Sequence, residues 1–192
     1  MKLNVIKNNG FTIVELLITS VVISVGLLSV VSMMVNTFVS SAALSSNLTA
    51  SYLTQEGFEL VRRVRDTNFN KRYTGEEADE DRFWLSNLME SGDVVVGGMD
   101  YESESLEEGL ENQNLRIDNN GLFGYSGGEE TSFQREIRLE RGCYDGYLDD
   151  DFEDDYCGEG EAEYIEVKIT VSWSERGEEK KYEAKSKLFN WY

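Results

Sequence analysis

The sequence predicts an α+β protein in which one long N-terminal helix carries a head built on an antiparallel β-sheet. Residues 11–66 contain no helix breaker other than Gly26 and Gly57, and a helix of that length would be ~84 Å long. Later in the chain, residues 131–140 and 164–173 alternate apolar and polar side chains, as strands with one buried face do. A helix followed by such strands is typical of the α+β class.

The first part of the helix is predicted to cross a membrane. Residues 16–55 contain no charge, and residues 16–35 form a run rich in Leu, Ile, Val and Met. At ~1.5 Å per residue, those 20 positions match the ~30 Å of bilayer hydrocarbon. A secretory signal peptide has a shorter apolar region of ~7–15 residues and a small-residue cleavage site. Because Lys2 and Lys7 precede the run and no base follows until Arg62, we expect a cytoplasmic N-terminus and an external body.

The second part of the helix is predicted to be amphipathic and to carry the head. Its apolar side is expected to comprise Leu44, Leu48, Tyr52, Leu53, Leu60, Val61 and Val64. Glu56 and Glu59 stand at helical spacings from Arg62, Arg63 and Arg65, which predicts ion pairs on a solvated face, with contacts to other acids as the alternative. The chain reads as a loop after Asn68.

The head is predicted to contain short elements followed by a three-stranded core. We expect a short helix at residues 82–89 anchored by Phe83, Trp84 and Leu88, a strand at 94–96, an outward loop at 103–114, and strands around a turn at 118–121. The clearest strands follow. In the first, one face is predicted to hold Phe133, Ile137 and Leu139. In the second, the buried face is predicted to hold Ile165, Val167, Ile169, Val171 and Trp173. After a turn at 175–178, a return strand is predicted to carry Tyr182, Ala184, Ser186 and Leu188 on one side.

Composition argues against several classes of function. Lys and Arg number 18 and Asp and Glu number 37 in 192 residues, so the net charge is −19, which disfavours direct nucleic-acid binding by the head. The chain contains no His, the commonest general base and zinc ligand. No catalytic constellation or phosphate loop is visible, and we therefore expect a protein that is not an enzyme and has no cofactor or metal.

The two cysteines predict a possible disulfide in an exported head. Cys143 and Cys157 enclose a segment with seven acids and no base. A bond closing this loop would contribute ~3 kcal/mol in the chain-entropy account. Clustered carboxylates also suit calcium, but the spacing lacks the EF-hand pattern, so a solvated acidic loop is the preferred interpretation.

Glu15 is the anomaly of the N-terminal segment, because a carboxylate beside a spanning helix is costly unless it is neutralised. Lys7 or a position at the interface would help. Alternatively, cleavage after Gly10 would give Phe11 an α-ammonium four residues before Glu15, on the same helical face. The ammonium of one subunit could then meet the Glu15 of a neighbour and set the register between two helices.

The stretch of Gly10, Phe11, Thr12 and Glu15 followed by Leu16 and Leu17 resembles the type III signal of type IV prepilins and pseudopilins. The resemblance implies that prepilin peptidase cuts between Gly10 and Phe11, that Phe11 is N-methylated, and that Glu15 aids recruitment into a filament. Residues 47–69, 115–125 and the C-terminal strands resemble minor-pilin-like proteins, including the PilV-like group. Together these segments cover about half of the chain, and the acidic insertions match poorly.

These inferences predict a minor pilin or pilin-like subunit of a type IV pilus-like filament. The expected divisions are a leader at 1–10, a transmembrane and assembly helix at 11–39, an amphipathic helix at 40–68 and an extracellular head at 69–192. The expected partners are other pilin subunits, prepilin peptidase, the membrane assembly platform and, before assembly, membrane lipid. The expected location changes from the cell membrane to the extracellular filament. A type II secretion pseudopilin and a non-polymerising membrane-anchored binding domain are the alternatives.

Within the helix, Gly26 is expected either to let the helix bend when it is packed in a filament or to form a close contact with another helix.

Overall fold

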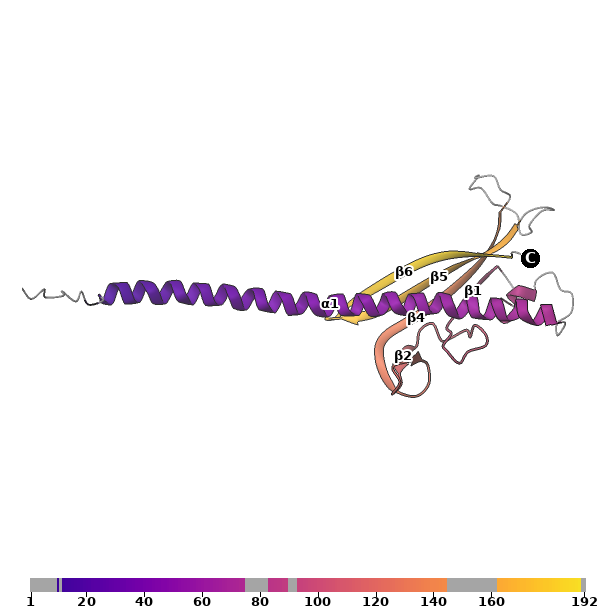
Figure 1. Cartoon of the computed structure of the whole chain (residues 1–192), viewed down its shortest axis with the longest axis horizontal. Helices are drawn as coiled ribbons and strands as arrows, with labels where there is room; N and C mark the ends of the chain where they lie inside the picture. Colours follow the sequence, from indigo (N-terminus) through magenta and orange to yellow (C-terminus); the bar gives the residue numbers. More distant parts are fainter. Residues whose placement is uncertain (1–9, 11, 75–82, 90–92, 145–161, 191–192) are drawn as a thin grey trace, which may run out of the picture. The chain divides into compact units, whose positions relative to one another are not determined.

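The computed structural model describes residues 10, 12–74, 83–89, 93–144 and 162–190. The chain divides into two compact units, Met1–Ser45 and Ser46–Tyr192. The first unit contains the start of helix α1 (Ile13–Thr74), and the second contains the rest of α1 and the head. Figure 1 shows the order of these elements along the chain.

Helix α1 continues to Thr74, so the expected loop after Asn68 is wrong for residues 69–74. The extension is stabilised by the segment that contains the 3₁₀ helix η1 (Phe83–Leu85). Buried Asn68 donates hydrogen bonds to the carbonyls of Trp84 (3.2 Å) and Ser86 (2.7 Å), and the Phe69 and Phe83 rings meet edge to face at 5.3 Å. The basic last turn, with Lys71 and Arg72, also suits the negative end of the helix dipole.

Within the described residues, the head contains one antiparallel sheet of six strands. They are β1 (Val94–Gly97), β2 (Asn114–Ile117), β3 (Phe123–Gly124), β4 (Glu129–Tyr144), β5 (Ala162–Glu175) and β6 (Glu178–Phe189). The order is β3-β2-β4-β5-β6, and β1 pairs with β4 beyond the end of β2. Figure 1 shows β4, β5 and β6 running beside the second half of α1, and this arrangement confirms the α+β prediction.

The predicted alternation in the long strands is confirmed on β5. Ile165, Val167, Ile169 and Val171 are fully buried and Trp173 is 3% exposed, while the intervening side chains lie on the outer face. The turn to β6 is a two-residue connection in which Arg176 and Gly177 both have positive φ (56° and 82°), as a type I′ hairpin requires. On β6, Leu188 is buried but Tyr182 is 39% exposed, so the side that these residues share is buried only toward the C-terminal end of the strand.

The side of α1 that meets the sheet differs from the predicted apolar side. Leu53, Leu60, Val61 and Val64 are buried as expected, together with Ala50. Leu44, Leu48 and Tyr52 are 61%, 51% and 69% exposed. Because a helix has 3.6 residues per turn, residues spaced by four move gradually around it. Leu44, Leu48 and Tyr52 therefore do not lie on the side that faces the sheet.

Gly57 explains how closely α1 approaches the sheet. A Cβ built at this position would lie 2.8 Å from Cδ1 of Ile169 and 3.4 Å from Cδ of Arg135. The glycine therefore costs helix propensity but lets the helix backbone contact β4 and β5.

The segment between β1 and β2 does not simply loop outward, as residues 103–114 were expected to do. Gly98 and Glu107 form a backbone bridge, the Leu106 N–H donates to the Asn87 carbonyl at 2.9 Å, and the partly buried Leu106 packs against the core. Strand β2 then begins at Asn114. Leu106, an apolar residue within an acidic stretch, is therefore one of the residues that hold the segment against the head.

Two smaller predictions in the head have different outcomes. The expected helix at 82–89 is shorter in the described residues, since η1 covers Phe83–Leu85 and turns follow, although Phe83, Trp84 and Leu88 are buried as anchors. The turn at 118–121 is confirmed. The Asp118 carboxylate accepts the N–H groups of Asn120 and Leu122, and Gly121 has a φ of 83°.

Candidate functional site

The N-terminal end of α1 places Glu15 in the first helical turn. The hydroxyl of Thr12 accepts the Glu15 N–H at 3.2 Å, and the Thr12 carbonyl accepts the Leu16 N–H at 3.2 Å, so Thr12 is the N-cap. The Glu15 side chain is exposed, and within the described residues it has no hydrogen bond or ion pair. An acid in the first turn suits the helix dipole and leaves its oxygens open to an outside cation. Gly10 is exposed, whereas Phe11 lies outside the described residues.

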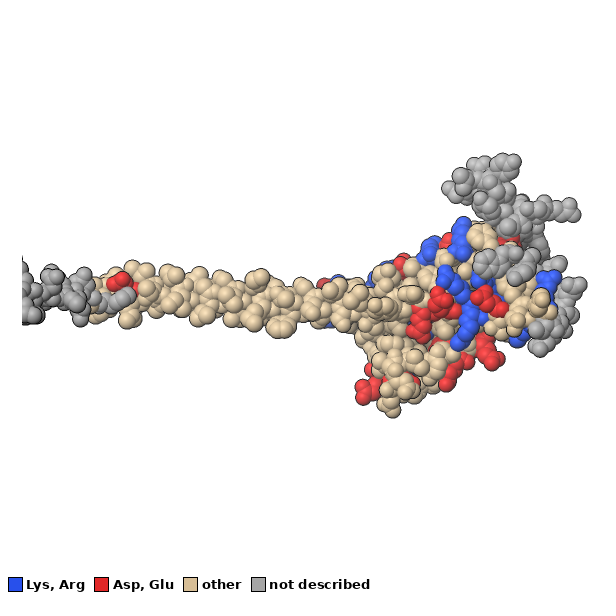
Figure 2. All heavy atoms as spheres, in the orientation of Figure 1, with Lys and Arg blue, Asp and Glu red and all other residues tan. Residues whose placement is uncertain are grey.

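The apolar part of α1 offers a surface that the first unit itself leaves uncovered. An 18-residue window of this helix has a mean hydropathy of 2.4, and none of the window is buried. It is the one helix in the described part of the chain that is long and apolar enough to cross a membrane. In the space-filling view, this stretch after the first turn carries neither acidic nor basic atoms (Figure 2).

Five hydroxyl side chains of this stretch are satisfied within the helix. The hydroxyls of Ser20, Ser24 and Ser29 donate to carbonyls three or four residues earlier at 2.7–2.9 Å. Thr19 and Thr37 do the same at 3.0 and 2.9 Å. Hydroxyls bonded in this way do not present unpaired donors to lipid. A Cβ added to Gly26 would meet nothing within 4 Å, so the first unit leaves this position open.

The charged residues of the head half of α1 form one of the predicted helical ion pairs and other contacts that the spacing does not predict. Arg62 pairs with Glu59 at 2.8 Å, as expected. Arg63 instead donates to the carbonyls of Tyr101 and Ser103 at 2.8 and 2.6 Å, and Arg65 pairs with its neighbour Asp66. Arg63 therefore fastens the acidic segment between β1 and β2 to the helix.

Arg135 is the principal residue that sequence reasoning missed. Its side chain is fully buried on β4, and its guanidinium donates to the carbonyls of Leu53 and Met99. The same group lies 3.4 Å from the carboxylate of Glu56 on α1. The signal was present in the sequence, because Arg135 is in phase with Phe133, Ile137 and Leu139 on the core face of β4.

Asp100 organises the start of the acidic segment. Burial acts to raise the pKa of this carboxyl, but hydrogen bonds from the Tyr125 N–H, the Ser103 hydroxyl and the N–H groups of Glu102 and Ser103 hold the pKa below its usual value. These donors occupy both carboxylate oxygens. Asp100 is therefore a structural turn residue rather than an open ligand.

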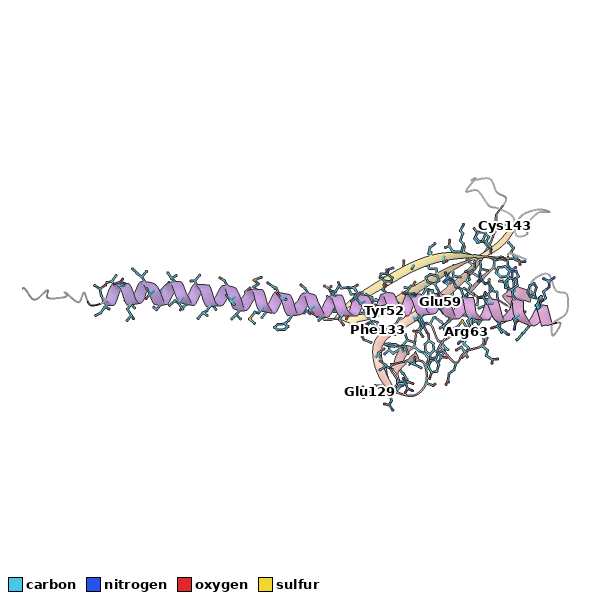
Figure 3. The ribbon with its side chains drawn as sticks, in the orientation of Figure 1. Tyr52, Glu59, Arg63, Glu129, Phe133 and Cys143 are labelled. Atoms are coloured by element: carbon cyan, nitrogen blue, oxygen red, sulfur yellow. The ribbon has the colours of Figure 1, made fainter. Side chains whose placement is uncertain are left out.

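The predicted disulfide and acidic loop fall mainly outside the described residues. Cys143, near the end of β4, is disulfide-bonded, whereas Cys157 lies outside them, so the pairing of the two stays a prediction. Glu129 and Cys143 mark the two ends of β4 in Figure 3. Among the residues that the structure describes, no cluster of three or more acids, histidines or cysteines is placed to hold a metal. The possible calcium loop, residues 145–161, lies outside that range.

The fold and the N-terminal segment together indicate the class of protein to which this chain corresponds. One long N-terminal helix, apolar in its first part, followed by an antiparallel sheet is the α+β layout of a type IV pilin-like protein. Residues 6–31 match the family model of the prokaryotic N-terminal methylation motif, and the chain therefore carries a prepilin-type signal. This signal supports a type IV pilin-like or pseudopilin-type subunit that is anchored in a membrane. Comparison with curated proteins and with solved structures finds no significant match. The assignment to the PilV-like group stays a prediction.

Proposed function

We propose that this protein is a structural subunit, of the minor-pilin type, in a type IV pilus-like filament. The observation that carries the proposal is the methylation motif at residues 6–31 together with Glu15, which is exposed in the first turn of an apolar helix. In this function prepilin peptidase cuts after Gly10, Phe11 is N-methylated, and the leader with Lys2 and Lys7 is lost. The mature chain then has a net charge of −21, since 37 acids face 16 bases.

The cost of placing the Glu15 carboxylate in lipid favours assembly with a neighbouring subunit. Glu15 in lipid is costly without a cation, and the described part of its own chain provides no partner. The α-ammonium of a neighbouring subunit would neutralise it, and burial in the helical bundle would strengthen the ion pair. The uncovered apolar side chains of α1 would then pack against the helices of other subunits.

Mass spectrometry of the N-terminal peptide tests the processing step. The proposal expects the mature membrane protein to begin at a methylated Phe11. A mature protein that retains Met1 would identify a non-polymerising anchored domain instead. Neighbouring assembly genes would separate a pilus subunit from a type II secretion pseudopilin, which has the same kind of N-terminus.

A substitution at Glu15 tests the assembly step separately. Glu15→Leu should leave membrane insertion and cleavage intact, because the apolar run is unchanged, but should lower the amount of the protein in sheared filaments. Glu59→Leu is the matched control, since Glu59 is an exposed acid on the same helix that lies in the head. Normal filament loading of Glu15→Leu would contradict the docking role.

A further inference from the structure

Strand β6 forms an open edge of the sheet. It ends the strand order and pairs with β5, and no other described strand lies on its second side. Eleven of its twelve residues are exposed or partly exposed. In Figure 1 it runs along the border of the sheet. An edge of this length presents backbone donors and acceptors that a further strand can pair with.

Four successive charges on the outer face of this edge alternate in sign. They are Glu179, Lys181, Glu183 and Lys185, and Lys187 follows with the same sign as Lys185. Their in-chain ion pairs, Glu183 with Lys168 and Lys185 with Glu166, place them on the same face as the polar side chains of β5. Tyr182, at the centre of this pattern, lies on the opposite face beside α1, in a groove that it shares with Phe58 and Ala184.

The alternation is self-complementary when two copies of β6 run antiparallel. If Tyr182 of one copy stands opposite Tyr182 of the other, Glu179 stands opposite Lys185, and Lys181 stands opposite Glu183. By symmetry this register forms four pairs of opposite charge and none of like charge. Cross-strand pairs of opposite charge stabilise a sheet, and like charges directly opposite destabilise it.

Neighbouring registers lose this match. Centring the pairing on Lys181 places that residue opposite itself and Glu179 opposite Glu183. Centring it on Glu183 places Glu183 opposite itself and Lys181 opposite Lys185. A centre between two residues would pair the outer face with the inner face, which the pleat forbids. The sequence of β6 therefore favours one symmetric register.

We propose that β6 is a self-recognition edge, which pairs antiparallel with β6 of a second copy of this chain and joins the two heads into one continuous sheet. Pairing of identical edges gives a closed two-fold dimer rather than an open chain. The lysines oppose pairing with uncharged strands, as charged edge residues generally do, while the matching pattern removes that penalty for the protein's own β6.

The geometry determines where the second copy belongs. A two-fold axis normal to the sheet reverses every direction in its plane, so the head portions of the two α1 helices run antiparallel. Subunits of one filament share a polarity, so the paired copies belong to two filaments or to two cells. The pairing rests on the head alone, whereas its place between filaments rests on the proposed function. A single strand pair is a small contact, and many copies along two filaments would act by avidity.

A cysteine at the centre of the contact tests the register directly. In the full-length chain, purified in detergent, Tyr182→Cys should give a disulfide-linked dimer, because directly opposed Cα atoms lie ~4.5–5.5 Å apart in an antiparallel pair, within disulfide range. Lys180→Cys is the matched control on the same face of β6. Its two copies would stand four residues apart along the strands, about 13 Å, and should not crosslink. Equal dimer yields from the two variants, or none from Tyr182→Cys, would overturn the proposal.

Charge reversal tests complementarity in the same Tyr182→Cys background. Glu179→Lys and Lys185→Glu should each lower the dimer fraction roughly tenfold, because two ion pairs become like-charge contacts. Mixing the two variants, or combining them in one chain, should restore crosslinking, since opposite charges again face each other. Glu129→Lys, an equal charge change at the far end of β4, should have no effect. Failure of the mixture to recover would exclude this register. The N-terminal mass of each sample reports cleavage after Gly10 independently, so failure of pairing and failure of the proposed function remain distinguishable.

Discussion

Arg135 of β4 and Glu56 of α1 form the ionic link between the sheet and the helix, with Nη1 of the arginine 3.4 Å from Oε2 of the glutamate. The arginine is fully buried and also donates to the carbonyls of Leu53 and Met99, whereas the Glu56 side chain is 32% exposed. One side chain thus joins α1, β4 and the start of the acidic segment. Its hydrogen bond to the Met99 carbonyl matters more than its ion pair, because Met99 lies outside the helices and strands and the guanidinium supplies the donor for this buried carbonyl.

Replacing Arg135 should therefore cost more stability than replacing Glu56. We expect Arg135→Met to lower the free energy of unfolding by about 2–4 kcal/mol and Glu56→Gln by about 1 kcal/mol, since glutamine still offers an acceptor. Guanidinium unfolding followed by tryptophan fluorescence measures both, because Trp84 and Trp173 are buried in the core. A larger loss from Glu56→Gln would show that the ion pair dominates.

The long elements of this fold could be predicted from the sequence because their signals are local. The uncharged run predicts the helix of the first unit, and the alternation in residues 164–173 predicts β5 and its buried face. Arg135 shows the limit of such reasoning. Its phase on β4 predicts burial, but its partners at Leu53 and Met99 lie 82 and 36 residues away in the chain. Only the packed head brings those carbonyls to the guanidinium.

Gly57 shows the same limit from the side of α1. Helix propensity alone assigns it a penalty of ~1 kcal/mol, while its contact with Ile169 cannot be read from a single sequence. Tertiary packing likewise determines which side of α1 faces the sheet. Leu48 and Leu53 have equal hydrophobicity, yet they point about 140° apart around a helix of 3.6 residues per turn.

Gly57→Leu should destabilise the head despite its better helix propensity. The added side chain would overlap Ile169 and the Arg135 stem, and overpacking of this kind costs about 1–3 kcal/mol. Gly26→Leu is the matched control, because nothing lies within 4 Å of that position in its unit. The free energy of unfolding of the head, measured by the same guanidinium titration, should fall for Gly57→Leu and stay unchanged for Gly26→Leu. Equal stability of the two variants would contradict the close contact.

Asp100 should make the head sensitive to acid. Its folded pKa lies below its unfolded value, so the ionised carboxylate stabilises the fold above pH ~4, and this contribution is lost as the pH falls through the folded pKa. Asp100→Asn should therefore lower stability at pH 7 and lose less on acidification than the natural chain. Unfolding curves between pH 7 and about pH 2.5 measure the difference, and Glu108→Gln, an exposed acid in the same segment, serves as the control. Parallel stability curves for Asp100→Asn and the natural chain would argue against this role.

Leu48 and Leu53 provide a matched test of which side of α1 supports the head. The Leu53 side chain is 2% exposed, whereas that of Leu48 is 51% exposed. Leu53→Gln should cost about 2–5 kcal/mol of stability, since it removes a packed side chain and buries an amide. Leu48→Gln should leave the free energy of unfolding unchanged. Under the proposed function it should nevertheless reduce filament loading, because Leu48 continues the apolar surface of α1 that neighbouring helices would cover. Destabilisation of the head by Leu48→Gln would place this residue in the core, and normal loading of that stable variant would remove it from the assembly surface.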